Sequence, residues 1–155
     1  MIRRTFSYST WIFVAGIFFL ASCGGGNQPQ SHAKSEVKEV DPNDPMNNKG
    51  IGPVKNITLG ELDQAMADEG QAIYQAKCTA CHKPNEKFIG PAPNGILQRR
   101  SPEWIMNMIL NPEEMIKEDP IAKKLLVESN LAPMANQHLT QEEARKILEY
   151  FRTLK

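Results

Sequence analysis

The pentapeptide CTACH, residues 78–82, constrains the fold of this chain more than any other part of the sequence. Two thiols stand three residues apart, and an imidazole follows the second thiol directly. The only other cysteine among the 155 residues is Cys23, close to the N-terminus. No pair of cysteines is therefore left to form a structural disulfide, and the motif itself must account for Cys78 and Cys81.

Three kinds of chemistry use two cysteines at this spacing. A structural zinc site needs four protein ligands, and here the second pair is missing. A thioredoxin-like redox pair requires strands around it, and no strand-like alternation is visible. Covalent attachment of haem c uses C-x-x-C-H, in which two thiols bond the porphyrin vinyl groups and the histidine reaches the iron. The pattern favours one haem c, attached to Cys78 and Cys81 and ligated by His82.

Helix signals enclose this motif on both sides. Thr58 and Glu61 form a capping-box pattern, which predicts a helix that runs from there into the motif. Gly70 lies on the apolar face of this helix and predicts close approach of another element. A second capping-box pattern, Thr140 and Glu143, opens the last helix, whose apolar residues recur at helical spacing.

The middle of the chain predicts short helices separated by loops. Residues 83–98 are rich in Pro and Gly and read as a loop. The sequence SPEW places Ser101 as an N-cap before a proline, and NPEE at 111–114 repeats the signal. Another short helix is expected over 120–128, followed by a loop over 130–138. The predicted fold class is all-α.

From residue 60 onwards the chain resembles the class I c-type cytochromes, which carry a single haem. The resemblance rests on Gly70 and Tyr74, then CTACH, then Gly90-Pro91, then a methionine loop, and finally Tyr150 and Phe151. It implies a small fold in which the first and last helices cross. It also implies that the Pro91 carbonyl accepts a hydrogen bond from His82. Donors to the haem propionates are expected from Arg99, Arg100 and Trp104.

The sixth iron ligand is expected in the loop before the last helix. Four methionines follow the motif: Met106, Met108, Met115 and Met134. Met106 and Met108 lie in a helical segment and Met115 begins a short helix, so core packing suits them better. The family resemblance places the ligand at Met134, and His138 or an open site are the alternatives.

The first residues read as an export signal. Arg3 and Arg4 precede an apolar run over 11–21, which is shorter than the roughly 20 residues that a membrane span needs. The run ends in LASC, which resembles the bacterial lipobox. We therefore expect a lipoprotein signal peptide over 1–22 and lipidation of Cys23, with an uncleaved membrane anchor as the alternative.

The remaining chain divides into two parts. Residues 24–57 are rich in Gly, Pro, Asn and charged residues and show no apolar period. The sequence therefore predicts a lipid-anchored flexible tether over 23–57 and a cytochrome c domain over 58–155. The protein is expected to be held at a membrane and to face the periplasm.

Charge excludes one class of partner and suggests another. The 18 basic and 18 acidic residues balance, which argues against binding to nucleic acid. Lys77, Lys83 and Lys87 flank the motif and would surround an exposed haem edge, where they would steer an acidic redox partner. No small-molecule substrate is expected.

With both axial positions filled, the natural function is electron transfer rather than catalysis. We expect single electrons to pass from a quinol-oxidising membrane complex to a periplasmic reductase or oxidase. Residues 109–140 resemble small cytochromes associated with nitrous-oxide reduction, which suggests nitrous-oxide reductase as the acceptor. A haem catalyst or gas sensor with an open sixth site, or a haem subunit of a larger oxidase, are the alternatives.

Overall fold

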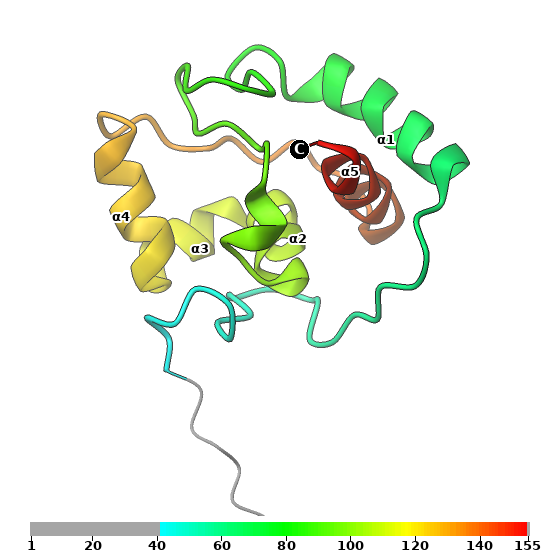
Figure 1. Cartoon of the computed structure of the whole chain (residues 1–155). Helices are drawn as coiled ribbons and strands as arrows, with labels where there is room; N and C mark the ends of the chain where they lie inside the picture. Colours follow the sequence, from blue (N-terminus) through cyan, green and yellow to red (C-terminus); the bar gives the residue numbers. More distant parts are fainter. Residues whose placement is uncertain (1–40, 155) are drawn as a thin grey trace, which may run out of the picture. The chain divides into compact units, whose positions relative to one another are not determined.

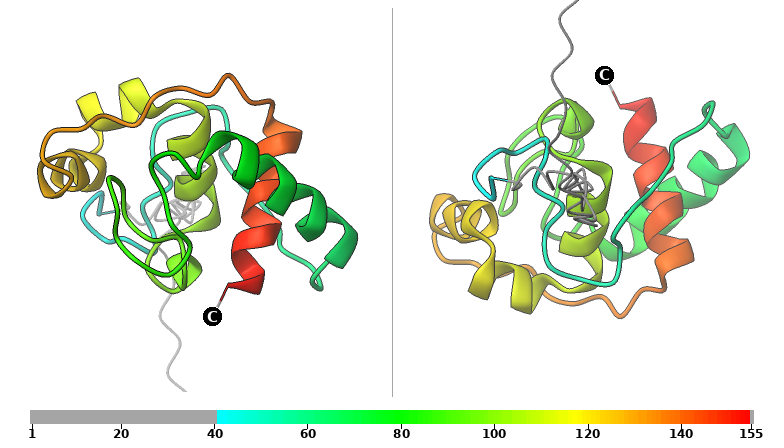
Figure 2. Two further views of the ribbon diagram at one scale, coloured as in Figure 1. Left: turned by 90° about the horizontal axis from the view of Figure 1, so that it is seen from above. Right: turned by 90° about the horizontal axis from the view of Figure 1, so that it is seen from below.

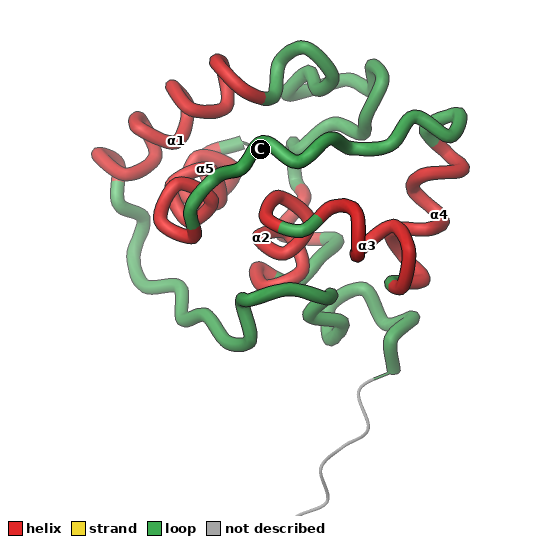
Figure 3. The backbone as a smooth tube through the Cα atoms, turned by 180° about the vertical axis from the view of Figure 1, so that it is seen from behind, coloured by secondary structure: helices red, strands yellow, loops and turns green. Residues whose placement is uncertain are grey.

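The computed structural model describes residues 41–154, and the predicted signal peptide, Cys23 and the tether up to residue 40 lie outside this range. The described residues form five α-helices, one short 3₁₀ helix and no strand (Figure 3). The elements in order are α1 (Gln64–Lys77), η1 (Ile96–Gln98), α2 (Pro102–Leu110), α3 (Pro112–Glu118), α4 (Pro120–Glu128) and α5 (Gln141–Thr153). The predicted all-α fold is confirmed. Between residues 41 and 154, no helix has the length and apolar character that crossing a membrane requires.

Helix α1 begins later than the sequence predicts. Its N-cap is Asp63, whose side chain accepts a hydrogen bond from the Met66 N–H at 3.0 Å. The predicted capping box at Thr58 is wrong, because residues 58–62 are not helical and α1 starts only after Asp63. The backbone N–H of Asp63 donates to the buried carboxylate of Glu149 at 2.9 Å, and this contact fixes the entry to the helix.

The crossing of α1 and α5 is confirmed, and a glycine permits it (Figure 1). A Cβ added to the buried Gly70 would collide with the backbone carbonyl of Lys146 and lie 2.9 Å from the Ile147 nitrogen. Beside this contact the ring of Tyr74 packs on Tyr150 and Phe151, with centroids 5.4 and 5.7 Å away. The two helices therefore meet backbone to backbone, with an aromatic cluster next to the contact.

Two of the three predicted caps of the later helices are present, at Ser101 and Thr140, whereas Asn111 makes no side-chain capping bond at the start of α3. Asp119 is a cap that the sequence analysis did not predict. Ser101 accepts from the Trp104 N–H at the start of α2, and Asp119 accepts from the Ala122 N–H at the start of α4. Thr140 and Glu143 form the complete reciprocal capping box of α5. Side-chain acceptors at these positions bind amide groups that have no partner within the helix. Contacts within a few residues therefore determine where α2, α4 and α5 begin.

Residues 41–57, which we call the strap, correct the predicted tether. Val54 and Asn48 are each only 6% exposed. The Asn107 side chain of α2 bonds both the N–H and the carbonyl of Val54, at 2.9 Å each, and also the Lys49 carbonyl at 2.8 Å. Figure 2 shows the strap running across α2 in the view from below. The prediction of a flexible tether is therefore wrong for residues 41–57, because buried side chains hold this polar segment in place.

A buried carboxylate fastens the entry of α1 to α5. Glu149 is fully buried and accepts from the guanidinium groups of Arg145 and Arg152, as well as from the Asp63 N–H. Burial by itself would raise the pKa of Glu149, but these hydrogen bonds and charges outweigh burial and lower the pKa. The charged form therefore stabilises the folded state.

Glu149→Gln is expected to lower the free energy of unfolding at pH 7 by about 2–3 kcal/mol, less than the loss typical of a fully buried pair, because both arginines retain some exposure. A depressed pKa contributes stability that is present above the unfolded pKa and is lost as pH falls through the folded value. The difference in free energy of unfolding between wild type and variant should therefore become smaller below about pH 4.5. Denaturant titrations at pH 7 and pH 4 measure both values, and a gap independent of pH would contradict the assignment.

Candidate haem site

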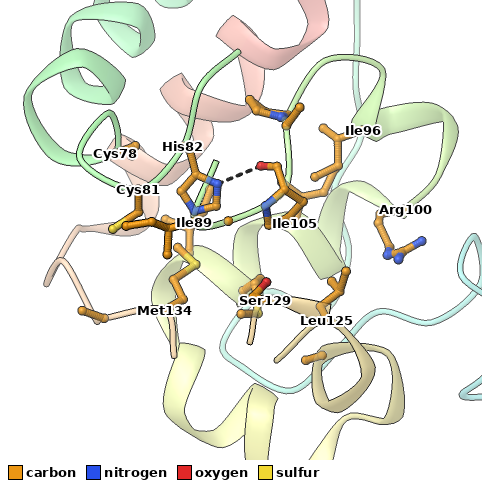
Figure 4. A pocket seen from close by; sticks show the side chains of 18 of the residues that line it. Cys78, Cys81, His82, Ile89, Ile96, Arg100, Ile105, Leu125, Ser129 and Met134 are labelled. Carbon is orange, nitrogen blue, oxygen red and sulfur yellow. Dashed lines mark hydrogen bonds between the residues drawn. The ribbon is translucent and has the colours of Figure 1, made fainter. Parts of the chain in front are cut away.

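A cavity of about 240 Å³ with mainly apolar walls opens between α1, α2, α4 and α5 (Figure 4). Every predicted site residue within the described range contributes to its lining: Cys78, Cys81, His82, Pro91, Arg99, Arg100, Trp104 and Met134. The predicted lipidation site, Cys23, lies outside that range. The structure thus brings together residues that are up to 56 positions apart in the sequence.

A tight turn at the end of α1 presents the motif to the cavity. The backbone N–H groups of Cys81 and His82 both donate to the Cys78 carbonyl, at 3.1 and 2.9 Å. The buried Tyr74 hydroxyl donates to the His82 carbonyl at 3.0 Å and fastens the turn to α1. Cys78, Cys81 and His82 consequently face one space.

The orientation of the His82 ring is fixed by the next loop. His82 Nδ1 donates to the Pro91 carbonyl at 2.9 Å, as the sequence predicts, so Nδ1 carries the proton (Figure 4). This leaves Nε2 without a proton and able to bind a metal. Gly90 packs against the ring so closely that an added Cβ would lie 2.7 Å from Nδ1. The sequence places Gly90 in a loop, and the structure shows that it also makes room for the imidazole.

Of the four methionines after the motif, two line the cavity. These are Met108 on α2 and Met134 in the loop before α5. Figure 4 shows the Met134 sulfur pointing into the cavity toward His82. Met106 is packed in the core, and the sulfur of the buried Met115 accepts from the Ile51 N–H at 2.9 Å. His138 does not line the cavity.

The three expected propionate donors differ in their contacts. The Trp104 Nε1–H already donates to Asp119 Oδ1 at 3.1 Å, so the prediction that Trp104 donates to a propionate is wrong. Arg99 uses two nitrogens to bind the carbonyls of Asn94 and Ala92, at 2.9 and 3.1 Å. Arg100 Nε is buried and has no hydrogen-bond partner among the described residues.

One wall of the cavity was not predicted from the sequence. Ala122, Leu125 and Leu126 of α4 line it, opposite the motif loop. Their spacing along a helix is the signal by which they were recognisable, but the same pattern is typical of any core-facing helix. Sequence reasoning therefore predicts that this helix face is buried and does not say that it faces a ligand.

Comparison with known proteins decides the family. The family model described as Cytochrome c matches residues 67–155, more than half of the chain. The chain belongs to the cytochrome c family. The curated "Cytochrome c-553-like" protein of Synechocystis sp. (strain ATCC 27184 / PCC 6803 / Kazusa) is 30% identical over 89 residues, which are 57% of this chain and 69% of that protein.

Solved structures of similar proteins agree with this fold. A cytochrome c from Rhodothermus marinus is 46% identical, with a TM-score of 0.63 over 65% of this chain and 87% of the other. An engineered cytochrome c from the same organism, described as bound to a carbene intermediate, is also 46% identical. Its TM-score is 0.60 over 65% of this chain and 88% of the other. This cytochrome c therefore has the small all-helical cytochrome c fold and binds covalent haem c.

The residues present fit that cofactor. Cys78 and Cys81 are both free thiols and lie at the cavity together with His82. The buried Arg100 Nε–H, which lacks a partner, suits a carboxylate such as a haem propionate. Burial, and then repulsion from Arg99, lowers the pKa of the Arg100 guanidinium, so an added negative charge would relieve the cost of burying it.

Burial also governs the other titratable groups of the site. It raises the pKa of the Cys78 thiol to about 11, with a further contribution from Cys81. The pKa of Tyr74 rises to about 12, mainly through burial and then through Cys78 and Tyr150. Tyr74 therefore stays protonated at neutral pH and keeps its hydrogen bond to the His82 carbonyl.

Two of the lysines near the motif contact other groups of the protein, although the sequence suggests that they are available to a redox partner. Lys83 pairs with Glu86 at 2.8 Å and lies 4.9 Å from the Phe88 ring centroid. The Lys87 ammonium donates to the Glu128 carbonyl at the end of α4, at 2.6 Å. Lys77 contributes to the cavity lining. Two of the three predicted steering charges thus have partners within the protein.

Gly90→Ala is expected to push the His82 ring out of position and weaken its hydrogen bond to Pro91. Overpacking of this kind costs about 1–3 kcal/mol, so the melting temperature of the holoprotein should fall by several degrees. Gly60→Ala is the matched control, because nothing lies within 4 Å of an added Cβ there. Thermal melts followed at the haem absorption measure both variants, and equal melting temperatures would contradict the role of Gly90.

Proposed function

We propose that this cytochrome c is a one-electron carrier in which His82 and Met134 are the axial ligands of the haem iron. One observation carries the proposal: the two side chains line the same apolar cavity, together with both cysteines of the motif. His82 presents Nε2, since Nδ1 is bonded to Pro91. A methionine as sixth ligand would fill the position that a substrate would otherwise need and would raise the reduction potential.

The chain's own residues suit a carrier. The attached haem supplies one-electron chemistry. The motif turn, Pro91 and Gly90 hold the imidazole from three sides, so its position should change little between oxidation states. The mainly apolar walls of the cavity would limit the access of water to a bound haem.

A redox titration of the holoprotein tests this function. We expect a single reversible wave that follows the Nernst equation for one electron, with the same visible spectrum after repeated cycles. Oxidised protein should also accept electrons from a reduced quinol-oxidising complex and pass them to a periplasmic reductase. An irreversible wave, or consumption of peroxide or oxygen during the cycles, would argue for catalysis instead.

We further propose that Cys23 carries lipid and holds the protein at a membrane facing the periplasm. The support is the position of LASC at the end of the apolar run. Because Asn107 holds the strap against α2, the strap would not be part of a flexible link to the lipid. Cys23→Ala should move the protein from the membrane fraction to the soluble fraction after cell breakage. Retention of the variant in membranes would point to the uncleaved anchor.

The acceptor is proposed to be a periplasmic reductase, with nitrous-oxide reductase as the specific candidate from the resemblance of residues 109–140. Electron transfer to purified nitrous-oxide reductase tests it directly. Because Lys83 and Lys87 already have partners, Lys77 is the remaining candidate among the three for steering. A rate that falls steeply with ionic strength would support electrostatic steering, and a constant rate would argue for an uncharged docking face.

A second function is favoured by one of the similar structures. The engineered Rhodothermus relative is described as bound to a carbene intermediate, so an engineered cytochrome c can hold a small group. On that basis a catalyst or gas sensor with a labile sixth ligand is the competing proposal. Binding of carbon monoxide to the reduced protein distinguishes it from a carrier.

A further inference from the structure

Three carboxylates are buried among residues 41–154, and one of them differs from the others. Glu149 contacts two arginines, and Glu103 lies 3.5 Å from the Lys49 ammonium. Asp119, which is 2% exposed, has no cation within ion-pair distance in the described part of the chain. The Arg100 guanidinium acts on Asp119 only from beyond that distance, so the burial of this carboxylate needs a further explanation.

The hydrogen bonds of Asp119 all come from neutral donors. Oδ1 accepts from the Trp104 indole N–H at 3.1 Å and from the Ala122 N–H at 2.8 Å. Oδ2 accepts from Asn48 Nδ2 of the strap at 2.7 Å. These contacts join α2, α4 and the strap at one point, and none of them neutralises a charge.

The strap determines which end of the Asn48 amide faces Asp119. Asn48 Nδ2 also donates to the Pro42 carbonyl at 2.7 Å, and Asn48 Oδ1 accepts from the Gly50 N–H at 2.7 Å. If the amide were flipped, its oxygen would face the Pro42 carbonyl oxygen and its NH₂ group would face the Gly50 N–H. Neither pair can form a hydrogen bond, so the amide cannot turn. Asp119 Oδ2 therefore accepts from an N–H group, and the strap fixes this contact.

The Asp119 carboxylate lies behind the residues that line the cofactor cavity and does not line it itself. Two of its three partners, Trp104 and Ala122, line that cavity themselves. Arg100 lies 5.3 Å from the Trp104 ring centroid on the same wall. Oxidation of a haem adds one positive charge at the iron, and a nearby buried negative charge favours the oxidised state because little solvent screens the interaction.

We propose that the buried Asp119 carboxylate lowers the reduction potential of the haem and that Asn48 of the strap fixes the position of this carboxylate. Asp119 acts through the field across the cavity wall and is a positioning and tuning residue, not a ligand. The inference rests on haem occupying the cavity and does not depend on which residue is the sixth ligand.

Two neutral variants and one control test the proposal. Asp119→Asn removes the charge and keeps the side-chain shape, although the new NH₂ group would face the NH₂ group of Asn48. Asp119→Ser removes the charge, keeps an N-cap acceptor for α4 and avoids that clash. Glu149→Gln is the control, because it also removes one buried negative charge, but neither Glu149 nor its hydrogen-bond partners line the cavity.

Redox titration of the three holoproteins gives the readout. For each Asp119 variant we expect the ferric-to-ferrous ratio at fixed potential to fall at least threefold, a rise in potential of about 28 mV at 59 mV per tenfold change. Glu149→Gln should shift the potential by less, while thermal melts report the loss of stability in all three. If neither Asp119 variant exceeds the Glu149→Gln shift, or if the variants lower the potential, the proposal is wrong. The near-infrared sulfur–iron band, recorded on the same samples, reports the sixth ligand separately.

Discussion

Met134→Ala is expected to abolish the near-infrared sulfur–iron absorption band and to lower the reduction potential. Loss of the thioether removes the ligand that favours the reduced iron. The fall should be on the order of 0.1 V, part of the roughly 0.8 V range that axial ligands cover. The vacated position should also make the reduced protein bind carbon monoxide. Absorption spectroscopy and a redox titration measure all three effects.

Met108→Leu is the matched control, since Met108 also lines the cavity but lies on α2. This variant should keep the near-infrared band and the wild-type potential within the error of the titration. If Met134→Ala kept the band and Met108→Leu lost it, Met108 would be the ligand. If both kept it, neither Met134 nor Met108 would supply the sulfur ligand.

Gly70→Ala is expected to destabilise the protein by about 2 kcal/mol, even though alanine favours a helix by about 1 kcal/mol. The added Cβ meets backbone atoms of Lys146 and Ile147, and no change of rotamer can relieve the collision. Helices α1 and α5 must therefore move apart and disturb the aromatic cluster beside the motif. The melting temperature of the holoprotein should fall by about 8 °C.

Gly60→Ala, the control variant used for Gly90→Ala, is also the control for Gly70→Ala. Gly60→Ala adds an identical methyl group in open space and should leave the melting temperature unchanged or slightly raised. A Gly70→Ala protein as stable as the wild type would show that the two helices can separate without cost, against the packing described above.

Local patterns predicted much of this fold because their causes are local. Ser101 and the Thr140–Glu143 pair bond to amides a few residues away, so their positions follow from short stretches of sequence. Gly70 was also informative, since a glycine on an apolar helix face has few reasons to be there other than close contact. The CTACH motif predicts the cofactor for the same reason: all its chemistry lies within five residues.

The predictions that were wrong depended on partners distant in sequence. Thr58 and Glu61 match a capping box, yet the N–H of Asp63 binds Glu149, 86 residues later, and the helix starts there instead. The strap reads as a linker because it is rich in Gly, Pro, Asn and charged residues. Asn107, 53 residues after Val54, supplies the hydrogen bonds that keep it folded, and no local pattern reveals that partner.

In the haem site, too, some features were predicted from the sequence and others were not. Cys78, Cys81, His82, Pro91 and Met134 were predicted to meet, and the structure places them around one cavity. The sequence did not show which donors were free: Trp104 is bonded to Asp119, whereas Arg100 Nε is left for a ligand. Residue types predict which hydrogen bonds are possible, and only packing decides which of them form.

Addition of carbon monoxide to the reduced wild-type holoprotein tests the central claim most directly. If His82 and Met134 both bind the iron, no coordination position is open and the visible spectrum should not change. Rapid formation of a carbon monoxide complex by the wild-type protein would contradict the account and would identify the protein as a haem catalyst or sensor.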